Sequence, residues 1–377
     1  MGRRIASSIG ILFCLGLVLN AYPQNRSRRK AKNNGTSSKR EPDLSERIDR
    51  SVEAQVRKLG IPGFSLAVIS GKTTLIQKGY GFSNVKDESP VTPHTVFGIG
   101  AVTETFTAMA LLVLVDDGKV KLDIPISRYI TGLPASWRKL TLRQLASMNA
   151  GIPNEPATDV PWTDAMESLE KEPLAFTPGS NYLNSENSYR IIGTVIEQVT
   201  KQSYVEFLRS RIFGPLGMLD TAATDRNFDP PIATPYQKGP SGQFTPAAGY
   251  EKPESSFAAG MLASNTVDLA KYASALTGGK LLSPGGYELL WKKRPPLPSG
   301  SAPKWAFGWG SGSLGGHPLL TAIGNQAGVT ARLMIFPDDK LIVIGLANTK
   351  LPEAQMLTQS VANMVLGIDT PAIEEEK

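Results

Sequence analysis

The sequence has very little cysteine and histidine, and both shortages remove classes of chemistry. Cys14 is the only cysteine among 377 residues, and it lies in an apolar run near the N-terminus. The rest of the chain therefore forms no disulfide and has no thiol nucleophile. Two histidines, His94 and His317, argue against a histidine-rich metal site and against a histidine-based triad. We expect neither a cofactor nor a bound metal.

Acidic residues are missing from the first 40 positions, which contain nine Lys or Arg. The remainder holds 31 basic against 34 acidic residues, so the net charge of +6 is a property of the tail. The body has a net charge of about −3 and does not indicate nucleic-acid binding. Its composition, 41% hydrophobic and 20% charged, is ordinary for a globular protein.

The N-terminus has the pattern of an export signal. Arg3 and Arg4 precede the apolar run 5–19, which is short for a transmembrane helix. We therefore expect residues 1–21 to be a signal peptide and 22–42 a basic flexible linker, in a periplasmic or secreted protein. The alternative is an uncleaved membrane anchor, which the basic cluster at 28–30 favours. The last residues, 369–377, form an acidic tail.

Strands are predicted near both ends of the remaining chain. Residues 64–69 and 74–80 read as one hairpin, and 331–336 and 341–347 as a second. Helices are predicted before the first hairpin, capped by Asp43 and ending at Gly60, and after the second, from Pro352 to Gly367.

The stretch between the hairpins, about 120–290, is rich in helices and loops. We therefore predict an α+β domain over 43–368, in which an antiparallel sheet built from both ends of the chain is flanked by helices. The sheet lobe would comprise about 43–115 and 290–368, and a helical lobe about 116–289. A cleft between the two lobes is the expected site.

One segment between these regions, 97–108, reads F-G-I-G-A-V-T-E-T-F-T-A. It predicts a helix over 102–117, capped by Thr103 or Thr105 and stopped at Gly118. Because that helix is apolar on all sides, it should be buried in the middle of the domain.

The segment resembles the nucleophile motif of the serine β-lactamases and penicillin-binding proteins, Phe-x-Ile-Gly-Ser-x-Thr-Lys-x-Phe-Thr-Ala. In that motif the serine needs a base to take its proton, and residues three apart share one face of a helix. Ala101 stands at the serine position and Glu104 at the lysine position. The frame is kept, and both reacting groups are replaced.

The resemblance extends over roughly residues 45–350 and is strongest to the class C branch of that family. It implies the β-lactamase/transpeptidase-like fold, with an α/β sandwich lobe and a helical lobe. Matching fragments occur in the family's order at 79–82, 90–92, 122–125, 178–179, 204–221, 259–261, 268–270 and 307–309.

Three further motifs of the family keep their frames and lose their polar side chains. The Tyr-x-Asn motif falls on Asn184-Ser185-Glu186, where Tyr182 would fit only with a shift of register. The Lys-Thr-Gly or His-Thr-Gly motif falls on Ala322-Ile323-Gly324, and His317 lies five residues too early for it. The family's Leu-Leu-Thr-His-Thr-Ser-Gly segment corresponds to 145–151 and has lost its His and Ser.

Losses at four segments indicate that serine acyl transfer is no longer performed. The resemblance then implies a pseudoenzyme that binds a ligand, with Glu104, Asn184, Glu186, Gly324 and Asn325 as candidate contacts. Glu104 and Glu186 would be neighbours in the cleft and would favour an amine or a divalent cation, unless a local base such as Arg190 neutralises them. A small molecule or a peptidoglycan-like compound is the expected partner, and a membrane only through the N-terminal segment.

Two alternatives remain open. The chain could be an active hydrolase (a β-lactamase, a D-Ala-D-Ala peptidase or an esterase) that uses an unrecognised catalytic group. Other Ser-x-x-Lys patterns begin at Ser83, Ser136 and Ser301, but none of them opens an apolar helix. Alternatively, Glu104 and Glu186 could act as a carboxylate pair, in acid–base catalysis or as a cation binder.

Overall fold

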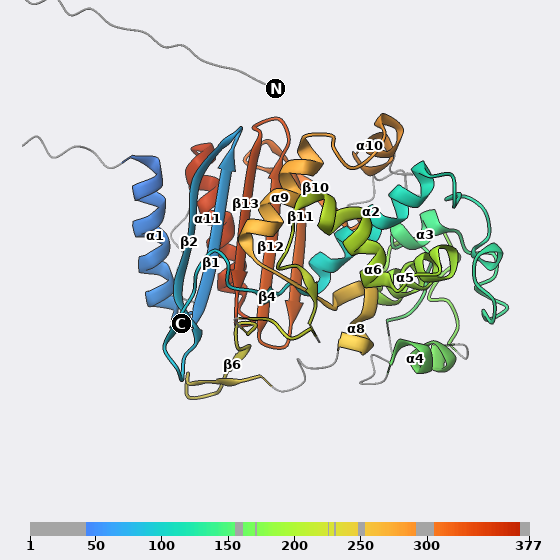
Figure 1. Ribbon diagram of the computed structural model, residues 1–377, viewed down its shortest axis with the longest axis horizontal. Helices are drawn as coiled ribbons and strands as arrows, with labels where there is room; N and C mark the ends of the chain where they lie inside the picture. The colour runs from blue at the N-terminus through green and yellow to red at the C-terminus, as the bar shows by residue number, and fades with distance from the viewer. Residues whose placement is uncertain are drawn as a thin grey trace, which may run out of the picture. The chain divides into compact units, whose positions relative to one another are not determined.

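A computed structural model describes residues 43–154, 161–169, 172–224, 226–229, 231–247, 253–291 and 305–369 (Figure 1). The expected signal peptide and linker, and all but the first residue of the acidic tail, lie outside the described residues. Within these ranges no helix is long and apolar enough to cross a membrane.

An eight-stranded antiparallel sheet is built from both ends of the chain. Its order is β3-β2-β1-β13-β12-β11-β10-β9, so the N-terminal strand β1 pairs directly with the C-terminal strand β13. Both predicted hairpins are confirmed as the pairs β1–β2 and β12–β13. The strands are β1 (Gly63–Ser70), β2 (Thr73–Asn84), β3 (Ser89–Pro90), β9 (Trp305–Ala306), β10 (Trp309–Leu314), β11 (His317–Gln326), β12 (Val329–Phe336) and β13 (Leu341–Ala347).

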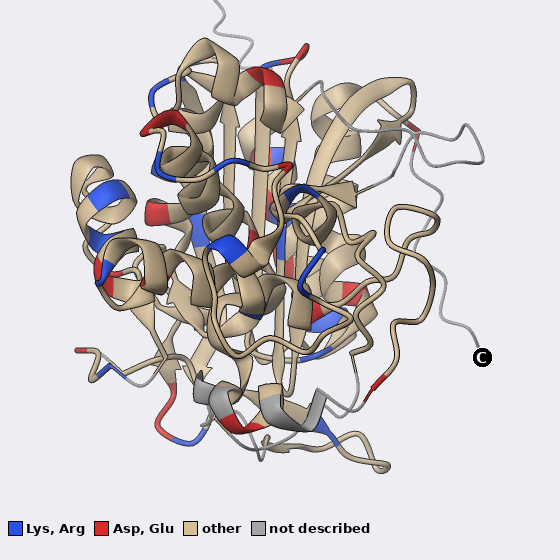
Figure 2. Cartoon of the chain, turned by 90° about the vertical axis from the view of Figure 1, so that its right-hand side faces the viewer, with Lys and Arg blue, Asp and Glu red and all other residues tan. Residues whose placement is uncertain are grey.

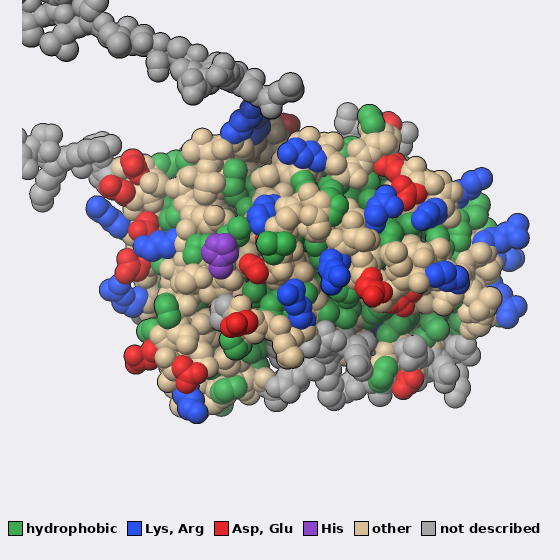
Figure 3. Space-filling view, in the orientation of Figure 1, with side chains coloured by type: hydrophobic (Ala, Val, Ile, Leu, Met, Phe, Trp, Pro, Cys, Tyr) green, Lys and Arg blue, Asp and Glu red, His purple; other side chains and the backbone are tan. Residues whose placement is uncertain are grey.

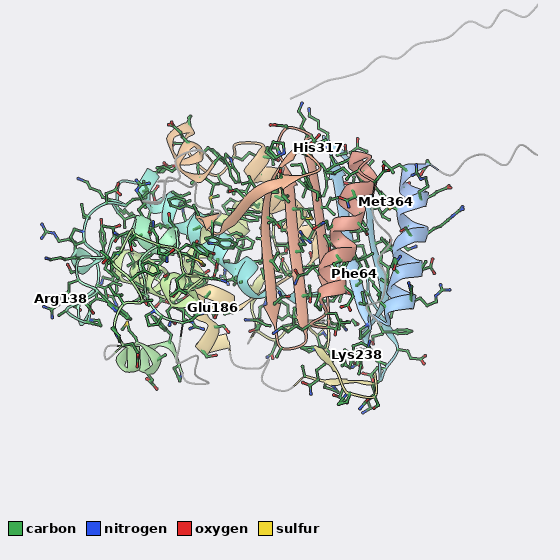
Figure 4. The ribbon with its side chains drawn as sticks, turned by 180° about the vertical axis from the view of Figure 1, so that it is seen from behind. Phe64, Arg138, Glu186, Lys238, His317 and Met364 are labelled. Carbon is green, nitrogen blue, oxygen red and sulfur yellow. The ribbon has the colours of Figure 1, made fainter. Side chains whose placement is uncertain are left out.

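Helices cover both faces of this sheet. On one face lies α11 (Pro352–Leu366), which Figure 4 shows in front of the strands, and α1 (Leu44–Leu59) packs against α11 and β2 at the edge of the sheet. The side chain of Asp43 accepts the Glu46 amide at the start of α1, and Gly60 ends that helix at φ 65°, as predicted. On the other face α9 (Thr266–Thr277) packs on β1 and β13 (Figure 1). This helix covers the sheet although its residues fall in the range expected for the helical lobe.

The other helices gather beyond the opposite edge of the sheet from α1 (Figure 1). With the sheet they confirm the predicted α+β class. They are η2 (Ile126–Arg128), α3 (Leu142–Ala146), α4 (Trp162–Leu169), α5 (Glu186–Thr200), α6 (Tyr204–Leu208), the π-helical turn η3 (Arg209–Phe213), α7 (Gly214–Leu216), α8 (Pro253–Gly260) and α10 (Pro284–Trp291). Two small antiparallel sheets complete the fold, β4-β8-β5 (Phe97–Gly98, Leu262–Ser264, Ala222–Ala223) and β6-β7 (Tyr236–Lys238, Phe244–Pro246).

Helix α2 (Thr103–Asp116) runs through the main hydrophobic core, and 12 of its 14 residues are buried, as its composition predicted. The Phe106 ring stacks on Tyr272 with centroids 4.1 Å apart. The predicted cap is wrong, because the 3-10 turn η1 (Gly100–Val102) runs directly into α2 and leaves no open end. Thr105 donates back to the Val102 carbonyl, and Thr103 accepts the Leu262 amide of β8 instead.

The turn η1 is pressed against strand β11 at Gly324. A Cβ atom at Gly324 would lie 1.9 Å from the Ile99 carbonyl oxygen and 3.2 Å from the Ala101 amide nitrogen. Real Cβ atoms do not approach so closely, so only glycine permits this contact. The contact fixes the start of α2 against the sheet, and with it the position of Ala101.

We expect Gly324→Ala to lower the free energy of unfolding by about 2–3 kcal/mol, because the added methyl group meets backbone atoms that cannot rotate away. Urea unfolding of the full chain measures the loss. Gly312→Ala on β10 is the matched control, since nothing lies within 4 Å of its added Cβ. Equal stability of the two variants would contradict the tight contact.

Candidate functional site

The start of α2 presents no reactive group at the nucleophile position. Ala101 is the middle residue of η1 and is partly exposed. Strand β4 and the hydrogen bond from the Ile99 amide to the Leu262 carbonyl hold the turn from one side, and β11 holds it from the other. The scaffold is therefore ordered around a side chain that carries only a methyl group.

Strand β11 divides its predicted residues between its two faces, because alternate residues of a strand point to opposite sides. Ala322 is fully buried and, like Gly324, lies on the side that faces η1. Asn325 lies apart from this group, since its side-chain oxygen accepts the Gln355 amide of α11, at 2.9 Å, on the other side of the sheet. The structure thus places Gly324 at the site and turns the side chain of Asn325 away from it.

Gln326 is a site residue that the sequence reasoning missed. Its amide nitrogen donates to the Gly260 carbonyl at 3.1 Å and to the Ser256 hydroxyl at 3.3 Å, and its Cγ lies 3.3 Å from the position of a Cβ on Gly100. The signal was available, because residues 322, 324 and 326 share one face of a strand. Gln326 therefore joins β11 to α8 beside η1.

Glu104 is a buried carboxylic acid with a relative exposure of 1%. Burial raises its pKa well above the ordinary value of 4.5, and the neighbouring Glu186 raises it further, whereas Arg190 acts against both. Among the described residues no side chain or amide donates a hydrogen bond to its carboxylate. The neutral, protonated form is favoured for these reasons.

Glu186 and Arg190 form an ion pair one turn apart at the start of α5. An Arg190 Nη2 donates to Glu186 at 3.0 Å, and Nη1 donates to Asn187 at 2.6 Å. The Arg190 side chain is 8% exposed and lies over the Trp162 ring, whereas the Glu186 side chain is 46% exposed. Burial lowers the pKa of Arg190, and the two glutamates oppose that effect. Arg190 is therefore the cation that interacts with both carboxyl groups.

The loop before α5 fixes this ion pair. The Glu186 amide donates to the Asn154 side chain at 2.9 Å, and the Asn187 side chain donates to the Pro153 carbonyl at 2.7 Å. Asn184 is exposed, and Ser185, which lies between Asn184 and Glu186 in the sequence, is buried. Figure 4 shows Glu186 among the helices, well separated from His317, which pairs with Asp339 at 2.9 Å at the end of the sheet.

Two tyrosines lie near Glu104. Burial raises the pKa of Tyr182, and Glu104 raises it further, so this phenol ionises less readily than a free one. Tyr189 was missed by the sequence reasoning. Its hydroxyl donates to the Ala146 carbonyl at 2.9 Å and accepts the Gly308 amide at 2.6 Å. It joins α3 and α5 to the turn after β9, where a Cβ on Gly308 would lie 2.6 Å from the Glu104 carbonyl oxygen.

Several buried polar atoms around this region have no protein partner among the described residues. They are the hydroxyls of Ser147, Ser185 and Ser188, the side-chain oxygen of Asn149 and the Arg190 Nε. The segment of Ser147 and Asn149 lies beside the loop before α5, because the Met148 and Asn149 carbonyls accept the Leu183 and Gly179 amides. Buried polar atoms normally find partners, so these atoms are candidates for hydrogen bonds to water or to a polar ligand.

No group of three or more His, Cys, Asp or Glu side chains within the described ranges is placed to hold a metal ion. The Glu104 and Glu186 pair has no further ligand of these types there. Arg190 is the local base that pairs with Glu186, so a cation is already present at this pair.

Comparisons with known proteins agree with this fold. A family model described as Beta-lactamase matches residues 48–364, and the chain therefore belongs to the β-lactamase family. Protein flp of Staphylococcus aureus (strain NCTC 8325 / PS 47) is 26% identical over 197 residues, which cover 49% of this chain and 40% of the relative. Unguisins hydrolase ungD' of Aspergillus campestris is 28% identical over 319 residues, which cover 77% of this chain and 59% of the relative. The chain thus spans less than two thirds of either relative.

Solved structures share the fold at lower identity. D-amino acid amidase from Ochrobactrum anthropi, in complex with L-phenylalanine amide, superimposes with a TM-score of 0.77 at 22% identity, covering 86% of this chain and 99% of the amidase. The octameric penicillin-binding protein homologue from Pyrococcus abyssi gives 0.75 at 24% identity, covering 86% and 77%. FmtA from Staphylococcus aureus gives 0.75 at 20% identity, covering 89% and 94%. The predicted β-lactamase/transpeptidase-like fold is confirmed.

We expect Glu104→Gln to become more stable than the natural chain as the pH rises. A carboxyl group whose pKa is raised in the folded state contributes its full stabilisation below 4.5, and this is lost as the pH rises toward the folded pKa. Glutamine has no such loss, and each unit of pKa shift is worth about 1.4 kcal/mol.

The measurement is the difference in the free energy of unfolding between variant and natural chain from pH 4 to pH 8. Glu53→Gln, the same substitution at an exposed position of α1, is the matched control. A difference for Glu104→Gln that does not vary with pH would contradict the raised pKa.

Proposed function

We propose that this chain is an exported member of the β-lactamase family that no longer performs serine acyl transfer and instead binds a small ligand. The observation that carries the proposal is the pairing of Ala101 at the nucleophile position with Glu104, a buried acid, at the position of the base. An alanine cannot attack a carbonyl group, and a buried neutral acid cannot accept a proton from a nucleophile.

Other hydroxyl groups near the site are poor substitutes for the missing serine. The pKa values of Tyr182 and Tyr189 are raised by burial and by Glu104, which disfavours the anionic form that would attack. Thr103, Thr105 and Thr107 of α2 are engaged in hydrogen bonds. None of these tyrosines and threonines therefore supplies an activated nucleophile.

The ligand that suits these groups is a small molecule with a primary ammonium group. Glu186 is half exposed and paired with Arg190, so an incoming ammonium group would compete with Arg190 for this carboxylate. Glu104 interacts electrostatically with both residues. The unpartnered hydroxyl and amide oxygens nearby supply further acceptors. L-phenylalanine amide, which the structurally similar amidase binds, carries such a group and is a suitable probe. A peptidoglycan-like compound with a free amine belongs to the same class.

Intact-mass analysis after exposure to a fluorophosphonate or a labelled penicillin should show no added mass. The reason is that no described residue combines a hydroxyl nucleophile with a neighbouring base at the site. Ala101→Ser with Glu104→Lys should also remain unmodified, or nearly so, because Asn184, Glu186, Ala322 and Ile323 are unchanged. A stoichiometric adduct on any residue of the natural chain would refute the loss of acyl transfer.

Phenylalanine amide should bind, and Glu104→Gln with Glu186→Gln should weaken it about 10- to 100-fold, because two charge-assisted contacts are lost. Calorimetric titration measures both affinities. N-acetylphenylalanine amide has the same body without the charge and should not bind, and Glu53→Gln should leave the affinity unchanged. Equal binding of the charged and acetylated compounds would exclude an ammonium ligand while leaving the first prediction standing.

A further inference from the structure

A second candidate binding site lies beneath the π-helical turn η3, apart from the residues described above. A pocket of about 580 Å³ opens there between α6, η3, the turn after α7 and strand β5. That volume is within the range of small-molecule sites in proteins. None of the predicted site residues lines it.

The lining of the pocket combines a widened helical turn with small side chains. π-Helical turns are rare, and they occur often at functional sites. Ala222 and Ala223 of β5 form part of the wall and fill little space, while Phe213, Met218 and Met261 give an apolar lining. Methionine side chains adapt their shape to a flexible apolar ligand.

The rim of the pocket combines an exposed apolar side chain with two basic ones. Leu219 is 76% exposed, against 37–48% for the other exposed large hydrophobic residues. Arg209 and Arg226 also line the pocket and are exposed. Figure 3 shows Lys or Arg side chains intermixed with hydrophobic ones on the face that carries α6 and α9.

Neither arginine has a carboxylate partner within 4 Å among the residues that the structure describes. The acid nearest to Arg209 along the chain, Glu206, accepts the amide and hydroxyl of Ser203 at 3.1 Å and 2.8 Å and interacts with Arg209 only at longer range. Asp220, beside Leu219, accepts the Asn265 side chain at 2.9 Å. Arg211 differs from both arginines, because Asp117 pairs with it at 2.7 Å. Figure 2, which looks onto the helical side, shows acidic and basic residues interspersed along the chain.

We propose that this pocket binds a small amphiphile with one carboxylate and an unbranched apolar body. The carboxylate would contact Arg209 and Arg226, which line the rim and have no carboxylate within 4 Å in the described part of the chain, and the apolar body would cover Phe213, Met218 and Met261. Guanidinium groups suit carboxylates in particular, because their donors match the two oxygens. A ligand in this position would also cover Leu219.

The test is calorimetric titration of the full chain with decanoate, for which a dissociation constant of about 0.1 mM is expected from the size of the ligand. Arg209→Gln with Arg226→Gln should weaken binding at least tenfold. Leu219→Ser should weaken it severalfold. Arg47→Gln, at an exposed position of α1, is the matched control and should have no effect.

Decyltrimethylammonium has the same chain with a cationic head and should not bind. The proposal is overturned if decanoate does not bind, if the double arginine variant binds it equally well, or if the cationic compound competes with it. Binding to phosphatidylglycerol vesicles without any binding of decanoate would overturn it in favour of a membrane surface. The apolar run 5–19 is the same in every variant, so differences between variants report on the pocket alone.

Discussion

The complete burial of helix α2 is the constraint around which the other elements are arranged. Nearly every side chain of this helix is covered, so neighbours must approach it from all sides. The sheet reaches it through η1 and β11, and α5, α6, α8 and α10 pack along it. A helix that is apolar all round cannot be stable at a surface, and its position in the centre follows from that requirement.

The same burial decides the chemistry of Glu104. A side chain on the first turn of α2 is removed from water whatever its identity, because the backbone position is set by the packing of the helix. In the family motif a lysine occupies this position beside a serine. Here the acid loses hydration, gains a raised pKa, and depends on Arg190 for its nearest opposite charge. Arg190 in turn is hydrogen-bonded to Glu186 and Asn187 and lies over the Trp162 ring. The acid at the lysine position is therefore accompanied by an ordered ion pair on α5.

The sequence predicted the elements whose signals are local. The cap at Asp43, the stop at Gly60 and the two hairpins depend on residues close together in the chain, and all of them are confirmed. The predicted cap of α2 was wrong because the start of this helix depends on a distant strand. The Leu262 amide of β8 donates to the Thr103 hydroxyl, and a 3-10 turn precedes the helix without a break. Gln326 and Tyr189 were missed for the same reason, since their partners on α8, α3 and the turn after β9 lie far away in the sequence.

By itself, the sequence determined the fold and the identity of the groups at each motif position, because periodicity, turn residues and the order of the fragments are properties of the chain. Only the tertiary structure decided which of these groups meet. It brought Glu104, Glu186 and Arg190 close enough to interact electrostatically, whereas the side chain of Asn325 was turned toward α11. The physical reason is that a side chain's neighbours, its hydration and hence its pKa depend on packing between distant segments, which neighbouring residues in the chain do not specify.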